Sequence, residues 1–178
     1  MRFALVPAVC ALVGALASAS DASAQTPPLN CTPWGKPSMR GTMCTLAHDD
    51  TVKGNRLPAG TMIHHDSTNT LNFFWLVKPA RVRDLDLAGG SDGPHHNIWP
   101  DGTIRITYLS HPQTIQGVPC RSFRVLREIF GHTSRVSFHR NGRLAACRTD
   151  QAVTVQGKRF SGGDLVQLDS LGQLLARP

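Results

Sequence analysis

Two short glycine motifs alternate along this chain, and they constrain its fold more than any other feature. The first has the form V-x-G-x-x-Φ, with Φ apolar and isoleucine replacing valine in one copy, and occurs at residues 52–57, 115–120 and 155–160. The second has the form x-G-x-[I/L] and occurs at residues 101–104, 141–144 and 171–174. The glycines of successive motifs are fifteen residues apart in two cycles, Gly102 to Gly117 and Gly142 to Gly157. Such internal periodicity predicts a repeat architecture.

The repeating unit has the features of a β-hairpin. Asn141-Gly142 lies between two apolar runs and predicts a type I′ turn, because both residues tolerate positive φ. A single hairpin cannot bury its apolar face alone and must stack on its neighbours. The sequence therefore predicts an all-β fold of stacked antiparallel hairpins, as an open meander sheet or a β-roll, with turns at Gly102, Gly117, Gly142, Gly157 and Gly172.

Four stretches depart from this pattern. Residues 71–77 form the most apolar segment after the N-terminus and predict a buried strand. Residues 81–86 hold two arginines, Arg81 and Arg83, and two aspartates, Asp84 and Asp86, and predict a charge-balanced edge strand. Residues 88–99 are rich in glycine and polar residues and predict a loop. The apolar residues of segment 123–130 fit a short amphipathic helix and a strand about equally well.

The N-terminus carries the features of a secretory signal peptide. Arg2 precedes an apolar stretch over residues 3–17, and Ala22-Ser23-Ala24 resembles a cleavage site. The apolar stretch is too short for a membrane anchor, so the chain is not expected to span a membrane. We expect residues 1–24 to be removed, residues 25–40 to form a proline-rich extended leader, and residues 41–178 to form the repeat domain. The expected location is the periplasm or the cell exterior.

Four cysteines follow the predicted cleavage site, namely Cys31, Cys44, Cys120 and Cys147. An even number of cysteines in an oxidising compartment predicts two disulfides, for which three pairings exist. We favour Cys31–Cys44 and Cys120–Cys147, because each pair closes a short loop and the second pair links neighbouring strands of one repeat.

The chain is basic, with a formal net charge of +7. Its arginines are scattered over residues 121–148 rather than gathered in a run. This favours an ordinary basic surface over a dedicated polyanion site. If the charge does select a ligand, an exported protein meets anionic envelope polymers before nucleic acid, and no nucleic-acid partner is expected.

Histidine is the reactive residue type that suggests a site. The pairs His64-His65 and His95-His96 are candidate ligands for zinc or copper. Neighbouring residues of a strand point to opposite faces, so each pair offers one ligand to a given face. Ordinary structural histidines are the competing interpretation, because no H-x-H or H-x-x-x-H spacing occurs. His95, His96 and Trp99 in the predicted 88–99 loop form a candidate ligand-binding surface.

The glycine-punctuated hairpins, with phrases such as residues 138–144, resemble MORN-type and antitoxin-type hairpin repeats, and more closely exported bacterial repeat proteins without a known role. The resemblance covers residues 98–175 well and 41–63 faintly, and the Tyr-x-Gly-x-Trp phrase of MORN repeats is absent. It implies a binding or scaffolding role and supplies no catalytic residues. We therefore expect an exported, non-catalytic envelope protein with an unidentified envelope ligand or protein partner and no obligatory cofactor. The alternatives are a metal-binding protein or metal-dependent hydrolase that uses the histidine pairs, and a binder of anionic envelope polymers.

Overall fold

The computed structural model describes residues 30–35, 40–91, 93–124 and 134–175. These residues form seventeen strands and no helix, which confirms the all-β prediction. Nine strands make one open antiparallel sheet in the order β1-β2-β5-β6-β9-β10-β13-β14-β17. Their bounds are β1 Asn30–Trp34, β2 Gly41–Thr45, β5 Met62–Asp66, β6 Leu71–Trp75, β9 His95–Ile98, β10 Ile104–Thr107, β13 Val136–Phe138, β14 Leu144–Arg148 and β17 Leu165–Gln167.

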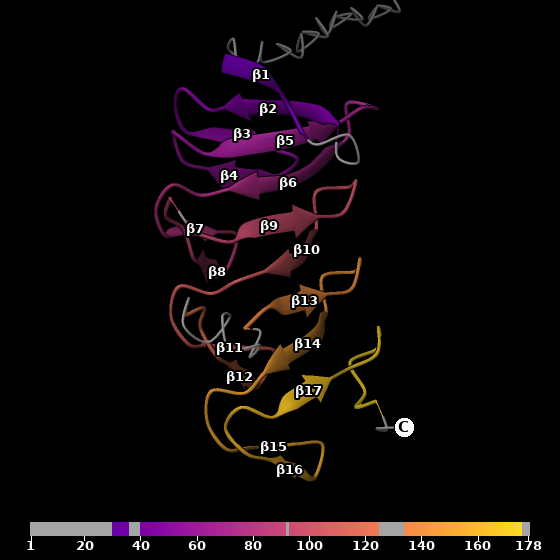
Figure 1. The fold of residues 1–178 in the computed structure, drawn as a ribbon. Helices are drawn as coiled ribbons and strands as arrows, with labels where there is room; N and C mark the ends of the chain where they lie inside the picture. The colour runs from indigo at the N-terminus through magenta and orange to yellow at the C-terminus, as the bar shows by residue number, and fades with distance from the viewer. Residues whose placement is uncertain (1–29, 36–39, 92, 125–133, 176–178) are drawn as a thin grey trace, which may run out of the picture.

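The other eight strands form four two-stranded side hairpins. They are β3 Asp50–Val52 with β4 Asn55–Leu57, β7 Ala80–Val82 with β8 Leu85–Leu87, β11 Gln113–Ile115 with β12 Val118–Cys120, and β15 Val153–Val155 with β16 Lys158–Phe160. Each side hairpin interrupts the connection between two neighbouring strands of the long sheet. In Figure 1 the chain leaves the long strands toward the side hairpins on the left, and tight turns join the long strands on the right. The repeating unit is thus two long strands plus one side hairpin.

The two glycine motifs build two different turns. In the side hairpin β11–β12, both Gln116 and Gly117 have positive φ, at 50° and 85°, as a type I′ turn requires. In the turn after β13, Gly142 has a φ of 78°, and the Gly142 amide donates to the His139 carbonyl at 2.9 Å. Because Asn141 has no positive φ, this is a type I turn closed by a left-handed glycine, and the type I′ prediction was wrong there.

A fourth copy of each motif is present without its glycine. Residues 82–87 form the tip and second strand of β7–β8, with a φ of 53° at Arg83, so the prediction of an edge strand over residues 81–86 was wrong. Asn69 closes the turn between β5 and β6 with a φ of 60°, a conformation that asparagine tolerates. Asn69 and the turn residue Asp84 are again fifteen residues apart.

The hydrophobic core lies between the long sheet and the row of side hairpins. Alternate residues of the long strands, among them Ile63, Phe74, Val136 and Val166, face inward and are at most 2% exposed. The side hairpins cover them with a matching set of apolar residues, which includes Leu57, Val82, Leu87, Val118 and Phe160. The strand predicted over residues 71–77 is β6, in the interior of the sheet.

The two disulfides join the pairs that the sequence favoured. The sulfur atoms of Cys31 and Cys44 lie 2.05 Å apart and tie the edge strand β1 to β2, so the predicted extended leader includes one strand of the sheet. The sulfur atoms of Cys120 and Cys147 lie 2.02 Å apart and tie the side hairpin β11–β12 to β14. The predicted signal peptide and residues 125–130 of the ambiguous segment lie outside the described residues. Residues 123 and 124 have no regular structure.

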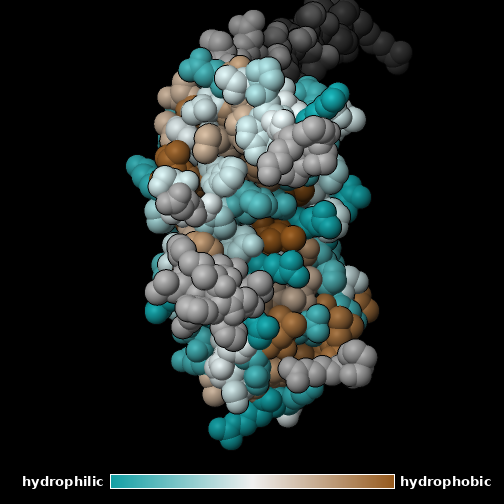
Figure 2. Space-filling view, in the orientation of Figure 1, coloured by the Kyte–Doolittle hydropathy of each residue, from teal (hydrophilic) through white to brown (hydrophobic). Residues whose placement is uncertain are grey.

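No helix of the described residues is long and apolar enough to cross a membrane. The face drawn in Figure 2 mixes polar and apolar residues, and apolar ones gather at the lower right, over the C-terminal strands. Leu171 and Leu175, which follow β17, are 71% and 50% exposed.

Candidate functional site

One continuous row of directly paired residues crosses the whole long sheet on the face away from the side hairpins, here called the outer face. From β1 to β17 the row is Thr32, Met43, His64, Phe73, Asn97, Ile106, Ser137, Ala146 and Gln167. The residues that alternate with this row belong to the core, so the row itself must point outward. From Met43 to Phe73 the row holds a thioether, an imidazole and a phenyl ring, whereas its last three residues, Ser137, Ala146 and Gln167, are small or polar.

Aromatic and imidazole rings gather around Phe73 in the N-terminal half of this face. The Phe73 ring stacks on His64 with centroids 4.5 Å apart and planes 11° apart. Its centroid lies 5.2 Å from that of His95, 5.7 Å from Trp34 and 6.2 Å from Trp75. We call these five residues the aromatic–histidine cluster. It forms because β5, β6 and β9 are neighbours in the sheet, which brings residues distant in sequence into one cross-strand patch.

Gly41 makes room for the cluster at its N-terminal edge. Gly41 pairs with Trp34 of β1, and a Cβ atom at Gly41 would overlap the carbonyl oxygen of His65 and the imidazole of His64. The absence of a side chain here lets the His64 ring lie against β2 and lets the Trp34 indole approach it edge to face, at a centroid distance of 5.0 Å.

Polar atoms within the cluster and next to it have no hydrogen-bond partner. Both ring nitrogens of His64 are buried without a partner, and so is Oδ1 of Asn97, on the other side of Phe73 in the same row. Burial lowers the pKa of His64, against the opposing effect of the Asp66 carboxylate, so the imidazole is neutral at physiological pH. A buried polar group without a partner costs about 1–3 kcal/mol, which makes these atoms the ones to explain.

The structure divides the four histidines of the predicted metal site. His64 and His95 share the outer face with the Phe73 ring between them, whereas His96 pairs with Phe74 and is fully buried in the core. His65 lies beyond a bulge in the pairing of β5 with β6. In the described part of the chain, no group of three or more histidine, cysteine, aspartate or glutamate residues is placed to hold a metal ion.

His96 is a core residue with both ring nitrogens in hydrogen bonds. Its Nε2 donates to the Ala88 carbonyl at 2.9 Å, and its Nδ1 accepts from the Thr107 hydroxyl at 2.7 Å. Burial lowers its pKa to about 4. In the repeats of β5 and β13, the corresponding inward positions hold Ile63 and Val136, so His96 fills the place of an aliphatic residue.

The predicted ligand loop is also divided. Residues 95–98 form strand β9 in the middle of the sheet rather than part of a loop, and His95 and His96 point to opposite faces of it. Trp99 follows the C-terminal end of β9, and the Arg105 guanidinium lies over its ring, 4.7 Å from the ring centroid. Of the three predicted residues, only His95 belongs to the aromatic–histidine cluster.

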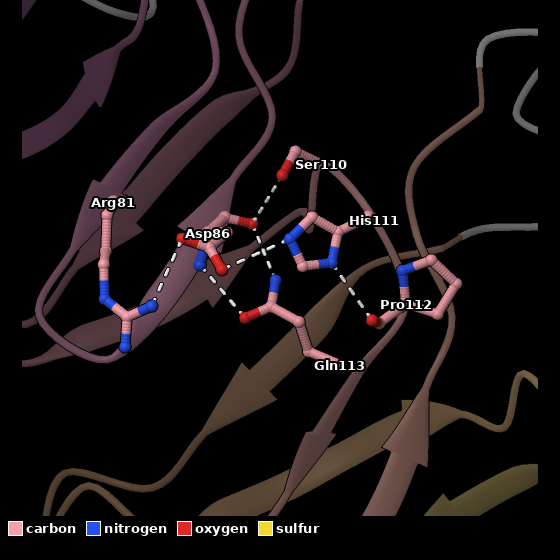
Figure 3. Close-up of polar contacts among 6 residues, drawn as sticks. All are labelled: Arg81, Asp86, Ser110, His111, Pro112 and Gln113. Atoms are coloured by element: carbon pink, nitrogen blue, oxygen red, sulfur yellow. Dashed lines mark hydrogen bonds and ion pairs between the residues drawn. The ribbon is translucent and has the colours of Figure 1, made fainter.

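A second polar group lies between the second and third side hairpins, around Asp86 (Figure 3). Arg81 and His111 approach the Asp86 carboxylate from opposite sides, at 3.6 Å and 3.2 Å. The Ser110 hydroxyl donates to the main-chain oxygen of Asp86, and the Gln113 amide bonds both the main-chain oxygen and the amide of Asp86. Because Ser110 does not bond His111, the group lacks the relay that activates a serine nucleophile. The group instead fastens β7–β8 to the chain that enters β11.

A groove of about 330 Å³ runs between these two side hairpins, a volume at the lower end of ligand pockets. Its lining includes Arg83, Gln113, Gln116, Ile104 and Phe138. Three polar side chains of the lining, those of Arg83, Gln113 and Gln116, are engaged within the protein. Arg83 donates to Oδ1 of Asn55 and to the Gly102 carbonyl, and Gln116 bonds the turn after β13. The groove therefore marks the contact between neighbouring repeats.

The arginines of the described residues are spread over several repeats. Arg140 donates to Asp101 at 2.7 Å and lowers the pKa of that carboxyl to about 2, and Arg148 donates to the Gly163 carbonyl. A hollow of about 530 Å³ mixes both signs of charge, with Arg121, Arg148, Asp150 and Asp164 in its lining. Binding of anionic envelope polymers stays a prediction.

No family model, curated protein or solved structure matches this chain. The resemblance to MORN-type repeats also stays a prediction. The site has to be judged on its own geometry, and the aromatic–histidine cluster is the place where side chains depart furthest from what the repeat requires.

Proposed function

We propose that this chain is an exported, non-catalytic binding protein of the cell envelope, and that the aromatic–histidine cluster is its ligand-binding face. The observation that carries the proposal is the contrast within the outer row. The backbone repeat is the same in both halves, and the C-terminal half folds with Ser137, Ala146 and Gln167 at positions equivalent to those of the cluster. The rings of the N-terminal half are therefore additions to the scaffold.

Two features of the cluster favour binding over a purely structural role. His64 and Asn97 hold buried polar atoms without partners on either side of Phe73, whereas packed cores satisfy such atoms. Trp75 and Trp34 are half-buried and His95 is exposed, so the cluster has a solvent-facing rim. Aromatic side chains with polar tips are typical of binding surfaces.

The disulfides support export. Disulfides persist in oxidising compartments such as the periplasm, and both pairs form here within bonding distance. The predicted signal peptide points the same way. A binding role fits an open repeat sheet, because such sheets present an extended surface to a partner.

Native mass spectrometry of the mature chain, recovered without denaturation from the periplasm of its own host, tests this function. We expect an additional bound mass that disappears on denaturation. The double substitution Trp75→Ala and His95→Ala should remove it, and the matched substitution Ser137→Ala on the outer face of the other half should leave it. A wild-type chain that carries nothing, or a double variant that keeps the same mass, would contradict the proposal.

A further inference from the structure

The two disulfides differ in how easily a reductant can reach them. Cys120 and Cys147 are both 0% exposed and belong to the hydrophobic core. Cys44 is 3% exposed and belongs to the same core, whereas its partner Cys31 is an exposed residue of the edge strand β1. Reduction begins when a thiolate attacks one sulfur of the bridge, so its rate depends on access to that sulfur. The Cys31–Cys44 bridge is therefore the one that a reductant meets first.

Strand β1 has few contacts with the rest of the chain apart from this bridge. Among the described strands it has a neighbour on one side only, β2, and four of its five residues are exposed. Pro33 has no backbone N–H to donate to that neighbour. Once the bridge is broken, only the remaining backbone pairing with β2 and the half-buried Trp34 side chain hold β1 in place.

Trp34 is the residue through which β1 contributes to the aromatic–histidine cluster. Its ring lies edge to face against His64 and Phe73, at centroid distances of 5.0 Å and 5.7 Å. Those two rings are 2% and 8% exposed, so contacts such as this one keep them from solvent. When β1 leaves the sheet, the ligand-binding face therefore loses Trp34, and His64 and Phe73 become more exposed.

We propose that the Cys31–Cys44 disulfide is a redox switch for the aromatic–histidine cluster, opened by a dithiol reductant that releases β1 from the sheet. The regulation rests on the proposed function, because it acts on the ligand-binding face already described. With the bridge closed, Trp34 completes that face. With the bridge open, the face loses Trp34 and binding weakens.

The chemistry is thiol–disulfide exchange. A thiolate of the dithiol attacks the exposed Cys31 sulfur, the bond to the Cys44 sulfur breaks, and Cys44 leaves as a thiolate. The second thiol of the dithiol then attacks the mixed disulfide and releases Cys31. The two protons of the dithiol end on Cys31 and Cys44, so the protein is reduced by two electrons and the dithiol is oxidised to a disulfide.

Graded reduction of the mature, disulfide-bonded chain tests the switch. The probe is reduced dithiothreitol, with free thiols trapped by iodoacetamide at intervals and located by peptide mass spectrometry. We expect Cys31 and Cys44 to become free about 100-fold faster than Cys120 and Cys147, because access limits the attack. In the chain reduced at this bridge alone, the amides of β1 should exchange hydrogen about ten-fold faster, while those of β14 stay as in the oxidised chain.

The double substitution Cys31→Ala and Cys44→Ala copies the open state without a reductant. Its β1 amides should exchange as fast as those of the selectively reduced chain, and dithiothreitol should not accelerate them further. Equal reduction rates of the two bridges, earlier reduction of Cys120–Cys147, or β1 amides that stay protected once the first bridge is open would each overturn the switch.

Native mass spectrometry separates the switch from the proposed function. Selective reduction should remove the mass that co-purifies with the wild-type chain, and a mass that stays bound would overturn control of the ligand-binding face by this bridge. A wild-type chain without any bound mass contradicts the proposed function but not the release of β1. The trapping and exchange measurements decide that release by themselves.

Discussion

The outer face of the N-terminal half and that of the C-terminal half are built on the same backbone but with different side chains. The row across the sheet holds Met43, His64 and Phe73 in the first half, and Ser137, Ala146 and Gln167 in the second. The inner face shows no such contrast, since apolar residues from every repeat pack against the side hairpins. The inner face and the turns are therefore built alike in every repeat, whereas the two halves differ in the side chains of their outer face.

The two halves also use their disulfides differently. In the first half Cys31–Cys44 joins directly paired residues of adjacent long strands. In the second half Cys120–Cys147 joins a side hairpin to the long sheet and is fully buried. The first bridge secures one edge strand, whereas the second secures the contact between the two layers.

The largest expected effect is at the centre of the aromatic–histidine cluster. Phe73→Ala removes a ring that is 8% exposed and contacts four other rings, and should lower the free energy of unfolding by about 3–5 kcal/mol. Its counterpart in the same row, Ile106→Ala, removes a half-buried side chain and should cost about 1 kcal/mol. Guanidinium chloride unfolding measures both. Equal losses would show that the two halves of the outer face are energetically alike.

Removing each disulfide sharpens the contrast between the halves. Replacing Cys120 and Cys147 by alanine opens a loop of 27 residues in sequence separation and leaves a small void in the core, at a cost of about 4 kcal/mol. Replacing Cys31 and Cys44 opens a separation of 13 and frees only β1, at a cost of about 2–3 kcal/mol. Thermal unfolding of the two variants gives the order. A larger loss of stability on removal of Cys31–Cys44 would show that the N-terminal edge of the sheet depends more on its disulfide than the contact between the layers does.

His96 lies at the boundary between the halves and makes stability depend on pH. Its pKa is about 4 in the folded chain, against an ordinary value of 6.5, because burial disfavours the charged form. The unfolded chain therefore binds the proton first, and the stability that is complete above pH 6.5 is lost as the pH falls toward 4. A shift of this size corresponds to about 3 kcal/mol. Unfolding free energies measured between pH 7 and pH 4 should show this decline.

The double substitution His96→Val and Thr107→Val tests whether His96 is the cause. It replaces the buried hydrogen-bonded pair by aliphatic side chains such as Val136 provides in the next repeat. Burial also lowers the pKa values of His64, His65 and His95, so part of the acid sensitivity should remain. The loss of unfolding free energy between pH 7 and pH 4 should therefore shrink by most of the amount that His96 contributes. An unchanged decline would assign the acid sensitivity to the other histidines.

Much of the fold could be predicted from the sequence because turns depend on local backbone preferences. Glycine spacing identified three copies of each turn and the repeat itself. The fourth copies were missed because Asn69 and Asp84 stand at the positions where the motifs have glycine. Positive φ values occur there at Asn69 and at Arg83. The fifteen-residue spacing from Asn69 to Asp84 was the signal that could have revealed them.

The site could be predicted only in part, because it depends on strand order rather than on local pattern. The alternation of side chains along a strand correctly predicts that His95 and His96 point to opposite faces, because their segment is strand β9. The segment was predicted as a loop because residues 88–99 are rich in glycine and polar residues, and His96 stands where strands β5 and β13 have isoleucine and valine. The meeting of His64, Phe73 and His95 follows from the adjacency of β5, β6 and β9, which no spacing in the sequence shows.

The smallest expected effect concerns the hydrogen bonds that link the tip of a side hairpin to the next turn of the long sheet, which occur in both halves. Gln116 at the tip of β11–β12 donates to the Gly142 carbonyl at 3.1 Å and accepts from the Leu144 amide at 3.0 Å, and Gln156 makes the same pair of bonds to Gly172 and Leu174. In the first half, Arg83 donates to the equivalent carbonyl of Gly102. Gln116→Ala should cost about 1 kcal/mol, because its two hydrogen bonds are partly exposed and water replaces them. Hydrogen exchange of the Leu144 amide should accelerate in this variant while that of Leu174 stays unchanged. If both amides accelerate, the repeats open together, and the two halves of the molecule are one cooperative unit rather than two.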